Sequence, residues 1–141
     1  MVNPSRVEEK LRRLREYLGV LRELRLVPPD ELVADKIRLG SVKYYLQVSI
    51  ECCLDIAGHV VASEGFRAPK DYGDTFIVLA ERGVLDRPFA EKLRQMAKFR
   101  NRLVHLYDEV DDRQVVDVLA ADLGDFDRFR DRVVALLGSG K

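Results

Sequence analysis

The apolar positions of this sequence recur with the period of an α-helix along almost its whole length. Near the N-terminus, apolar residues alternate four and three positions apart, as seen at Val7, Leu11, Leu14, Leu18 and Leu21. This spacing predicts a first helix with Ser5 as its N-cap, ended by the Pro-Pro-Asp segment at 28–30. A second helix is expected from about residues 31–35 to Ser63. Its middle, YYLQVSIECCLDIAGHVVA, is apolar on most sides, as in a central or subunit-interface helix.

Shorter elements follow the second helix. Segment 63–74, SEGFRAPKDYGD, contains the glycine and proline residues typical of a loop. DTFIVLAERG predicts a short helix with Asp74 as its cap and Gly83 as its stop. Asp86 and Pro88 open a further helix, whose inward stripe is Phe89, Leu93, Met96 and Leu103.

The polar segment DEVDDR interrupts the apolar pattern after Tyr107, and a last helix then carries the pattern from Val115 to Leu136. No useful length alternates with the period of a β-strand, and no internal repeat or linker is present. The sequence therefore predicts an all-α fold, an antiparallel bundle of four long helices and a short one. We expect residues 1–141 to form one domain.

Composition narrows the classes of partner. The formal net charge is zero, so any contact with nucleic acid must come from a local basic patch. The adjacent Cys52 and Cys53 point about 100° apart on a helix, which suits buried thiols better than a disulfide or a zinc site. The charged N-terminus lacks the apolar core of a signal peptide, and no stretch is expected to approach a membrane span. We expect a soluble, cytoplasmic protein with no membrane partner.

Polar residues recur at every fourth position of the second predicted helix. Each step of four residues turns the side-chain direction by about 40°, so these positions spread over one broad face. Glu51, Asp55 and His59 are candidates for lining a cleft, and the pattern is equally typical of a solvated stripe. No metal site is expected, because one histidine with carboxylates four and eight residues away lacks the companion ligands of zinc or di-iron centres.

A second cluster of polar residues lies in FRNRLVHLY, residues 99–107. On an unbroken helix Asn101 and His105 share a face, so the amide can orient the imidazole, while Arg100 and Tyr107 share another face. Arg100 and His105 lie about 140° apart around the axis and about 7.5 Å along it. They can act on one small group only at the rim of a groove, or if a second copy of the chain completes the site.

The chemistry of these two side chains suits metal-independent cleavage of a phosphodiester. A histidine can take a proton from a ribose 2′-hydroxyl or return one to the leaving oxygen. An arginine can hold the charge developing on phosphorus, and Arg102 can add phosphate affinity or form a salt bridge. Because the chain has 17 arginines, this spacing arises readily by chance. The residues alone therefore leave a catalytic and a structural interpretation open.

FRNRLVHLY resembles the R-x4-H-x-Y signature of HEPN-domain proteins, in particular the HepT-like toxins of prokaryotic toxin–antitoxin pairs. YYLQVSIECCLDIAGHVVA, DYGDTFIVLAERGVLD and LRQMAKFRNRLVHLYDEVD are similar to further blocks of that family, so the likeness covers nearly the whole chain. It implies a HEPN-like helical bundle that forms a two-fold homodimer. It also implies RNA as the substrate, with the motifs of both subunits lining one cleft.

The resemblance further implies a role for each motif residue. Arg100 and His105 would be catalytic, Asn101 would orient the histidine, and no cofactor or metal would be required. A cognate nucleotidyltransferase antitoxin of the MNT type would attach AMP to Tyr107 and silence the ribonuclease. The alternative is a non-catalytic subunit that binds nucleotide or RNA for a minimal nucleotidyltransferase.

Overall fold

The computed structural model describes residues 2–139, which form seven α-helices and one 3₁₀-helix and contain no strand. The elements in chain order are α1 (Pro4–Arg25), α2 (Pro29–Ala34), α3 (Lys36–Ser63), α4 (Asp74–Glu81), α5 (Arg87–His105), η1 (Tyr107–Glu109), α6 (Asp112–Ala121) and α7 (Leu123–Ser139). The predicted all-α class is confirmed. The helices outnumber the predicted four long and one short, because two of the expected long helices are each divided.

Local capping explains the break between α2 and α3. Asp35 has an extended backbone, and its carboxylate accepts hydrogen bonds from the backbone N–H groups of Ile37 and Arg38. It therefore ends α2 and caps α3. At the start of the chain the cap is Asn3 and not the predicted Ser5, because Pro4 already occupies the first helical turn and the Asn3 side chain accepts from the Arg6 N–H.

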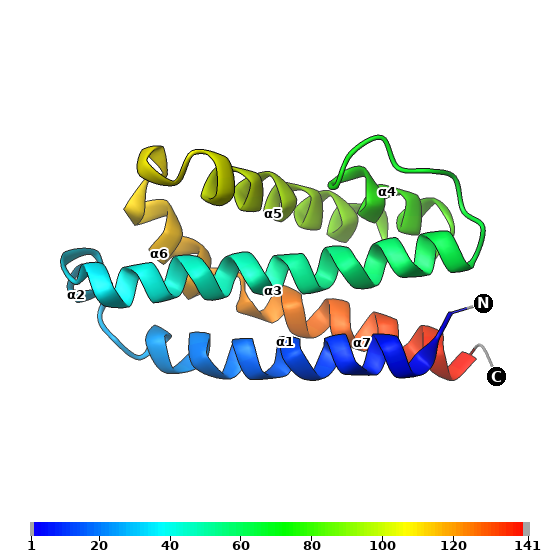
Figure 1. Cartoon of the computed structure of the whole chain (residues 1–141), viewed down its shortest axis with the longest axis horizontal. Helices are drawn as coiled ribbons and strands as arrows, with labels where there is room; N and C mark the ends of the chain where they lie inside the picture. Colours follow the sequence, from blue (N-terminus) through cyan, green and yellow to red (C-terminus); the bar gives the residue numbers. More distant parts are fainter. Residues whose placement is uncertain (1, 140–141) are drawn as a thin grey trace.

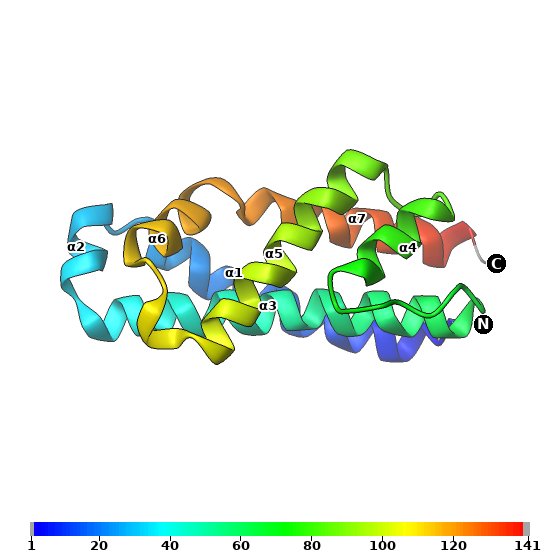
Figure 2. The ribbon, with the colours of Figure 1, turned by 90° about the horizontal axis from the view of Figure 1, so that it is seen from above.

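α3 is the central element of the bundle. Figure 1 shows α1 along one side of it and α5 with α4 along the other, with both termini at the same end. Figure 2 shows α5 crossing α3 at an angle. α3 packs against α1, α2, α4, α5, α6 and α7. The predicted inward residues of α5 (Phe89, Leu93, Met96 and Leu103) are all buried.

The apolar character of α3 reflects this central position. By length and composition alone it could cross a membrane, so the expectation that no stretch approaches a membrane span was wrong. Half of its most apolar stretch is buried inside the bundle, because neighbouring helices cover several of its sides. Cys52 and Cys53 are free and buried on this helix, and burial raises the pKa of both thiols.

The loop between α3 and α4 is fixed by ionic contacts. The Arg67 guanidinium donates to both carboxylate oxygens of Asp74 and of Glu81 over 2.8–3.0 Å. The N-cap of α4 is Gly73 and not the predicted Asp74, which is the first residue of the helix. The Asp74 carboxylate accepts from the backbone N–H of Lys70 in the preceding loop. Gly83 has a φ of 77° directly after α4, so the predicted glycine stop is confirmed.

These contacts predict a pH dependence. Hydrogen bonds from Arg67 lower the pKa of Asp74 to about 2 and also lower that of Glu81. Because the folded pKa lies below the unfolded value of about 4, the stabilisation is present above pH ~4 and is lost as the pH falls towards 2. The difference in Tm between the wild type and Arg67→Met should therefore be largest near neutral pH, shrink as the pH falls below ~4 and vanish only below pH ~2. If thermal unfolding curves gave the same difference in Tm at every pH, this account would be contradicted.

Candidate active site

The motif arginine is held by a carboxylate from the central helix. Nε and Nη2 of Arg100 donate to one oxygen of Glu51 at 2.9 and 2.7 Å, and Gln47 donates to the same oxygen at 3.3 Å. The remaining terminal nitrogen, Nη1, donates to the amide oxygen of Asn101 at 3.1 Å. The Arg100 side chain is only 17% exposed. The guanidinium is therefore oriented before any substrate binds.

An aromatic residue from the α3–α4 loop also contacts Arg100. The ring centroid of Tyr72 lies 5.5 Å from the guanidinium carbon of Arg100, within the range of a cation–π contact. Tyr72 is 57% exposed. Tyr72 was not among the predicted site residues, because neither its spacing nor its position in a Gly- and Pro-containing loop indicates that the loop returns to α5.

His105 is the last residue of α5 and its side chain is exposed. Within residues 2–139 its ring forms no hydrogen bond or ion pair with the rest of the chain. The amide oxygen of Asn101 binds Arg100 and not His105, so an orienting role of Asn101 towards the imidazole stays a prediction. The imidazole is therefore accessible to a substrate from solvent.

Tyr107 does not share a helix face with Arg100, because α5 ends at His105 and Tyr107 begins η1. This corrects the geometry expected for an unbroken helix. The Tyr107 ring lies 4.5 Å from Nζ of Lys43, and a Cβ atom at Gly40 would lie 3.8 Å from the Tyr107 hydroxyl. Lys43 is 8% exposed and forms an ion pair with Asp112 at 2.9 Å. The modification candidate therefore packs against the first half of α3.

Arg100 and Tyr107 thus both contact α3, but at different positions along its axis. Lys43, which contacts Tyr107, and Glu51, which contacts Arg100, are eight residues apart on this helix. At 1.5 Å per residue this separation is about 12 Å along the axis. A cavity of about 300 Å³ opens beside Tyr107, between the start of α3 and η1.

Two of the residues on α3 that were expected to line a cleft, Asp55 and His59, do not contact Arg100. Asp55 accepts from Lys10 on α1 at 3.1 Å, and His59 accepts from the backbone N–H of Asn3 at 3.1 Å. Both line a cavity between α1 and α3. The drift of about 40° per four residues carries the stripe around α3 and away from α5.

Arg102 also points away from its motif neighbour. It lies 5.6 Å from the Phe99 ring and lines a cavity against α6. This follows from helix geometry, since side chains two residues apart differ by about 200° in direction. Among residues 2–139 no group of three or more His, Cys, Asp or Glu side chains is arranged to hold a metal ion.

Comparison with known proteins shows the family of this chain. A family model described as Ribonuclease HepT-like matches residues 7–133. The chain belongs to the HepT-like ribonuclease family. It is 35% identical to the mRNA nuclease HepT of Shewanella oneidensis over 95 residues. This match covers 67% of this chain and 71% of the relative. It is 26% identical to the tRNA nuclease HepT of Aphanizomenon flos-aquae over 116 residues. This match covers 81% of this chain and 78% of that relative.

A solved HepT-like structure supports the fold assignment. The tri-AMPylated HEPN toxin of Shewanella oneidensis, in complex with MNT antitoxin, superposes with a TM-score of 0.85 at 27% sequence identity. The match covers 92% of this chain and 96% of the other. The predicted HEPN-like architecture and the resemblance to HepT-like toxins are confirmed.

Proposed function

We propose that this protein is the toxin of a toxin–antitoxin pair, a metal-independent endoribonuclease that acts in the cytoplasm as a homodimer. The observation that carries the proposal is that the last six residues of α5 carry both an oriented guanidinium, Arg100, and an exposed imidazole, His105. Membership of a ribonuclease family and the relatives named as mRNA and tRNA nucleases support RNA as the substrate.

The reaction follows from the chemistry of these two groups. The imidazole of His105 takes the proton of a ribose 2′-hydroxyl, and the resulting oxygen attacks phosphorus. The bond between phosphorus and the 5′-oxygen breaks, and that oxygen receives a proton from an imidazolium. Arg100 donates hydrogen bonds to the phosphoryl oxygens, where negative charge increases in the transition state.

Dimerisation supplies the second imidazole that a single copy of α5 lacks. Arg100 and His105 differ in direction by about 140° on α5, so a single copy cannot aim both at one phosphate from directly above it. In a two-fold dimer, His105 of the partner subunit brings a second imidazole to the cleft. One imidazole then acts as the base and the other as the acid.

The decisive experiment is incubation of RNA with the purified protein in excess EDTA. Cleavage under these conditions supports a metal-independent ribonuclease. RNA that stays intact while it binds the protein would instead favour the alternative function, a non-catalytic subunit that holds RNA or nucleotide for a nucleotidyltransferase.

Arg100→Ala should lower kcat for RNA cleavage by about 10²-fold or more, because one preorganised donor to the developing charge is lost. Arg102→Ala is the matched control, since Arg102 has the same charge two residues away but faces α6. Comparable losses in both variants, measured under single-turnover conditions, would show that only the general positive charge of α5 matters.

We further propose that an MNT-type nucleotidyltransferase silences the protein by adenylylating Tyr107. Tyr107 is half-exposed, and its ring centroid lies 4.5 Å from Nζ of Lys43 on α3. Because Tyr107 lies about 12 Å along α3 from the Glu51–Arg100 pair, several adenylates in series would extend the added negative charge towards Arg100. The tri-AMPylated state of the Shewanella toxin supports the addition of more than one adenylate.

A further inference from the structure

A cavity of about 570 Å³ lies between α3 and the loop that precedes α4. It is lined by Leu54, Asp55, Gly58, Pro69, Asp71, Tyr72 and Thr75. Its volume falls within the range of about 300–1,000 Å³ that is typical of small-molecule sites. We call this cavity the loop pocket. None of the motif residues lines it.

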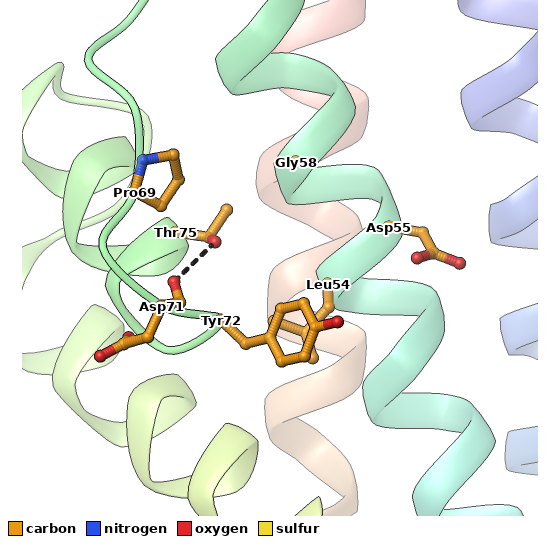
Figure 3. A pocket seen from close by; sticks show the side chains of 7 residues that line it. All are labelled: Leu54, Asp55, Gly58, Pro69, Asp71, Tyr72 and Thr75. Atoms are coloured by element: carbon orange, nitrogen blue, oxygen red, sulfur yellow. Dashed lines mark hydrogen bonds between the residues drawn. The ribbon is translucent and has the colours of Figure 1, made fainter. Parts of the chain in front are cut away.

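The interior of the loop pocket is uncharged. Figure 3 shows the Pro69 ring and Thr75 on one side and Gly58 and Leu54 on the other, with the Tyr72 ring in front of Leu54 in this view. The carboxylate of Asp55 points away from the space towards α1, where Lys10 binds it. The Asp71 carboxylate also points away from it and accepts the backbone N–H of Asp74. Without a cation in its lining, the pocket suits a flat, neutral ring and not a phosphate.

Tyr72 connects the loop pocket to the candidate active site. The same ring that lines the pocket lies 5.5 Å from the guanidinium of Arg100. A nucleotide joins its base to its phosphate through one ribose, so binding sites for the two must be neighbours. A cation for the phosphate and an aromatic-lined apolar cavity for the base are adjacent here.

The pocket is formed before any ligand binds. Arg67 fixes the loop to α4 through four hydrogen bonds of 2.8–3.0 Å. The end of the loop closes tightly on α5, since a Cβ atom at Gly73 would lie 2.7 Å from Cγ of Arg94. A preformed wall avoids the entropic cost of ordering the loop around a ligand.

We propose that the loop pocket binds an unpaired base of the RNA strand whose phosphate Arg100 holds, with Tyr72 stacked on that base. The inference rests on the proposed function, because it assigns a base subsite to the same active site. It makes Tyr72 a residue that selects single-stranded RNA, since a paired and stacked base cannot enter the pocket.

The test is a double-mutant cycle between Tyr72 and the base. Affinities are measured for a short single-stranded RNA and for versions with an abasic nucleotide at each position in turn, on the His105→Ala protein to prevent cleavage. One abasic position should weaken binding about tenfold, as expected for loss of one base–aromatic stack. In the His105→Ala/Tyr72→Leu protein the same abasic RNA should bind no worse than the intact RNA. Tyr72→Phe should behave like the parent, because it keeps the ring.

Additive losses from the abasic nucleotide and Tyr72→Leu would overturn the proposal. So would weaker self-association of Tyr72→Leu in sedimentation with unchanged RNA affinity, because the loop pocket would then be a contact with a second copy of the chain. The outcomes that refute the proposed function differ from those that refute the base subsite. If the wild type leaves RNA intact while the coupling is present, the base subsite stands without catalysis. Cleavage without coupling, or no RNA binding at all, refutes the subsite.

Discussion

His105→Ala is expected to abolish RNA cleavage and growth inhibition while the helical bundle stays folded. Removing a general acid or base costs about 10²- to 10⁴-fold in rate, and a dimer would lose the group from both subunits at once. The fold should survive because the imidazole is exposed and forms no hydrogen bond or ion pair with the rest of residues 2–139. Single-turnover cleavage and thermal unfolding of the same preparation measure the two effects.

His59→Ala is the matched control, because the chain has only these two histidines. His59 accepts the backbone N–H of Asn3 at the start of α1, so its loss should cost stability of about 1 kcal/mol. RNA cleavage should not change. If His105→Ala still cuts RNA at the wild-type rate, the imidazole has no catalytic role and the proposed mechanism is refuted.

Tyr107→Phe is expected to eliminate adenylylation by the cognate nucleotidyltransferase completely. The substitution removes only the hydroxyl that would accept the adenylate, while the ring can keep its contact with Lys43. Intact mass measurement after co-expression should show added adenylate on the wild type and none on the variant. The variant should inhibit growth even when the antitoxin is present, because it carries no adenylate that could compete with an RNA phosphate for Arg100.

Tyr44→Phe provides the control for this experiment. Tyr44 is also half-exposed and lies on α3, so it offers a similarly accessible hydroxyl elsewhere on the surface. It should be modified like the wild type. Adenylate found on Tyr107→Phe would place the acceptor at another residue and would remove the explanation of silencing through Tyr107.

The helical periodicity and the end signals of several helices could be predicted because they depend on neighbours in the chain. Asp86 caps α5 through the Phe89 N–H, three residues away, and Gly83 stops α4 by adopting a positive φ. The end of α5 was harder to predict. The apolar pattern continues through Leu106, yet the helix stops at His105 and Tyr107 turns towards Lys43 on α3.

By itself the sequence determined an all-α chain and a helix carrying Arg100, Asn101 and His105, because helix formation and apolar stripes follow from residues three and four positions apart. Only the tertiary structure decided what these side chains meet. Glu51 reaches Arg100 across 49 positions of sequence, and Tyr72 approaches it from a loop. Such contacts depend on how α3, α5 and the loop pack together, and no local spacing encodes the angle at which two helices cross.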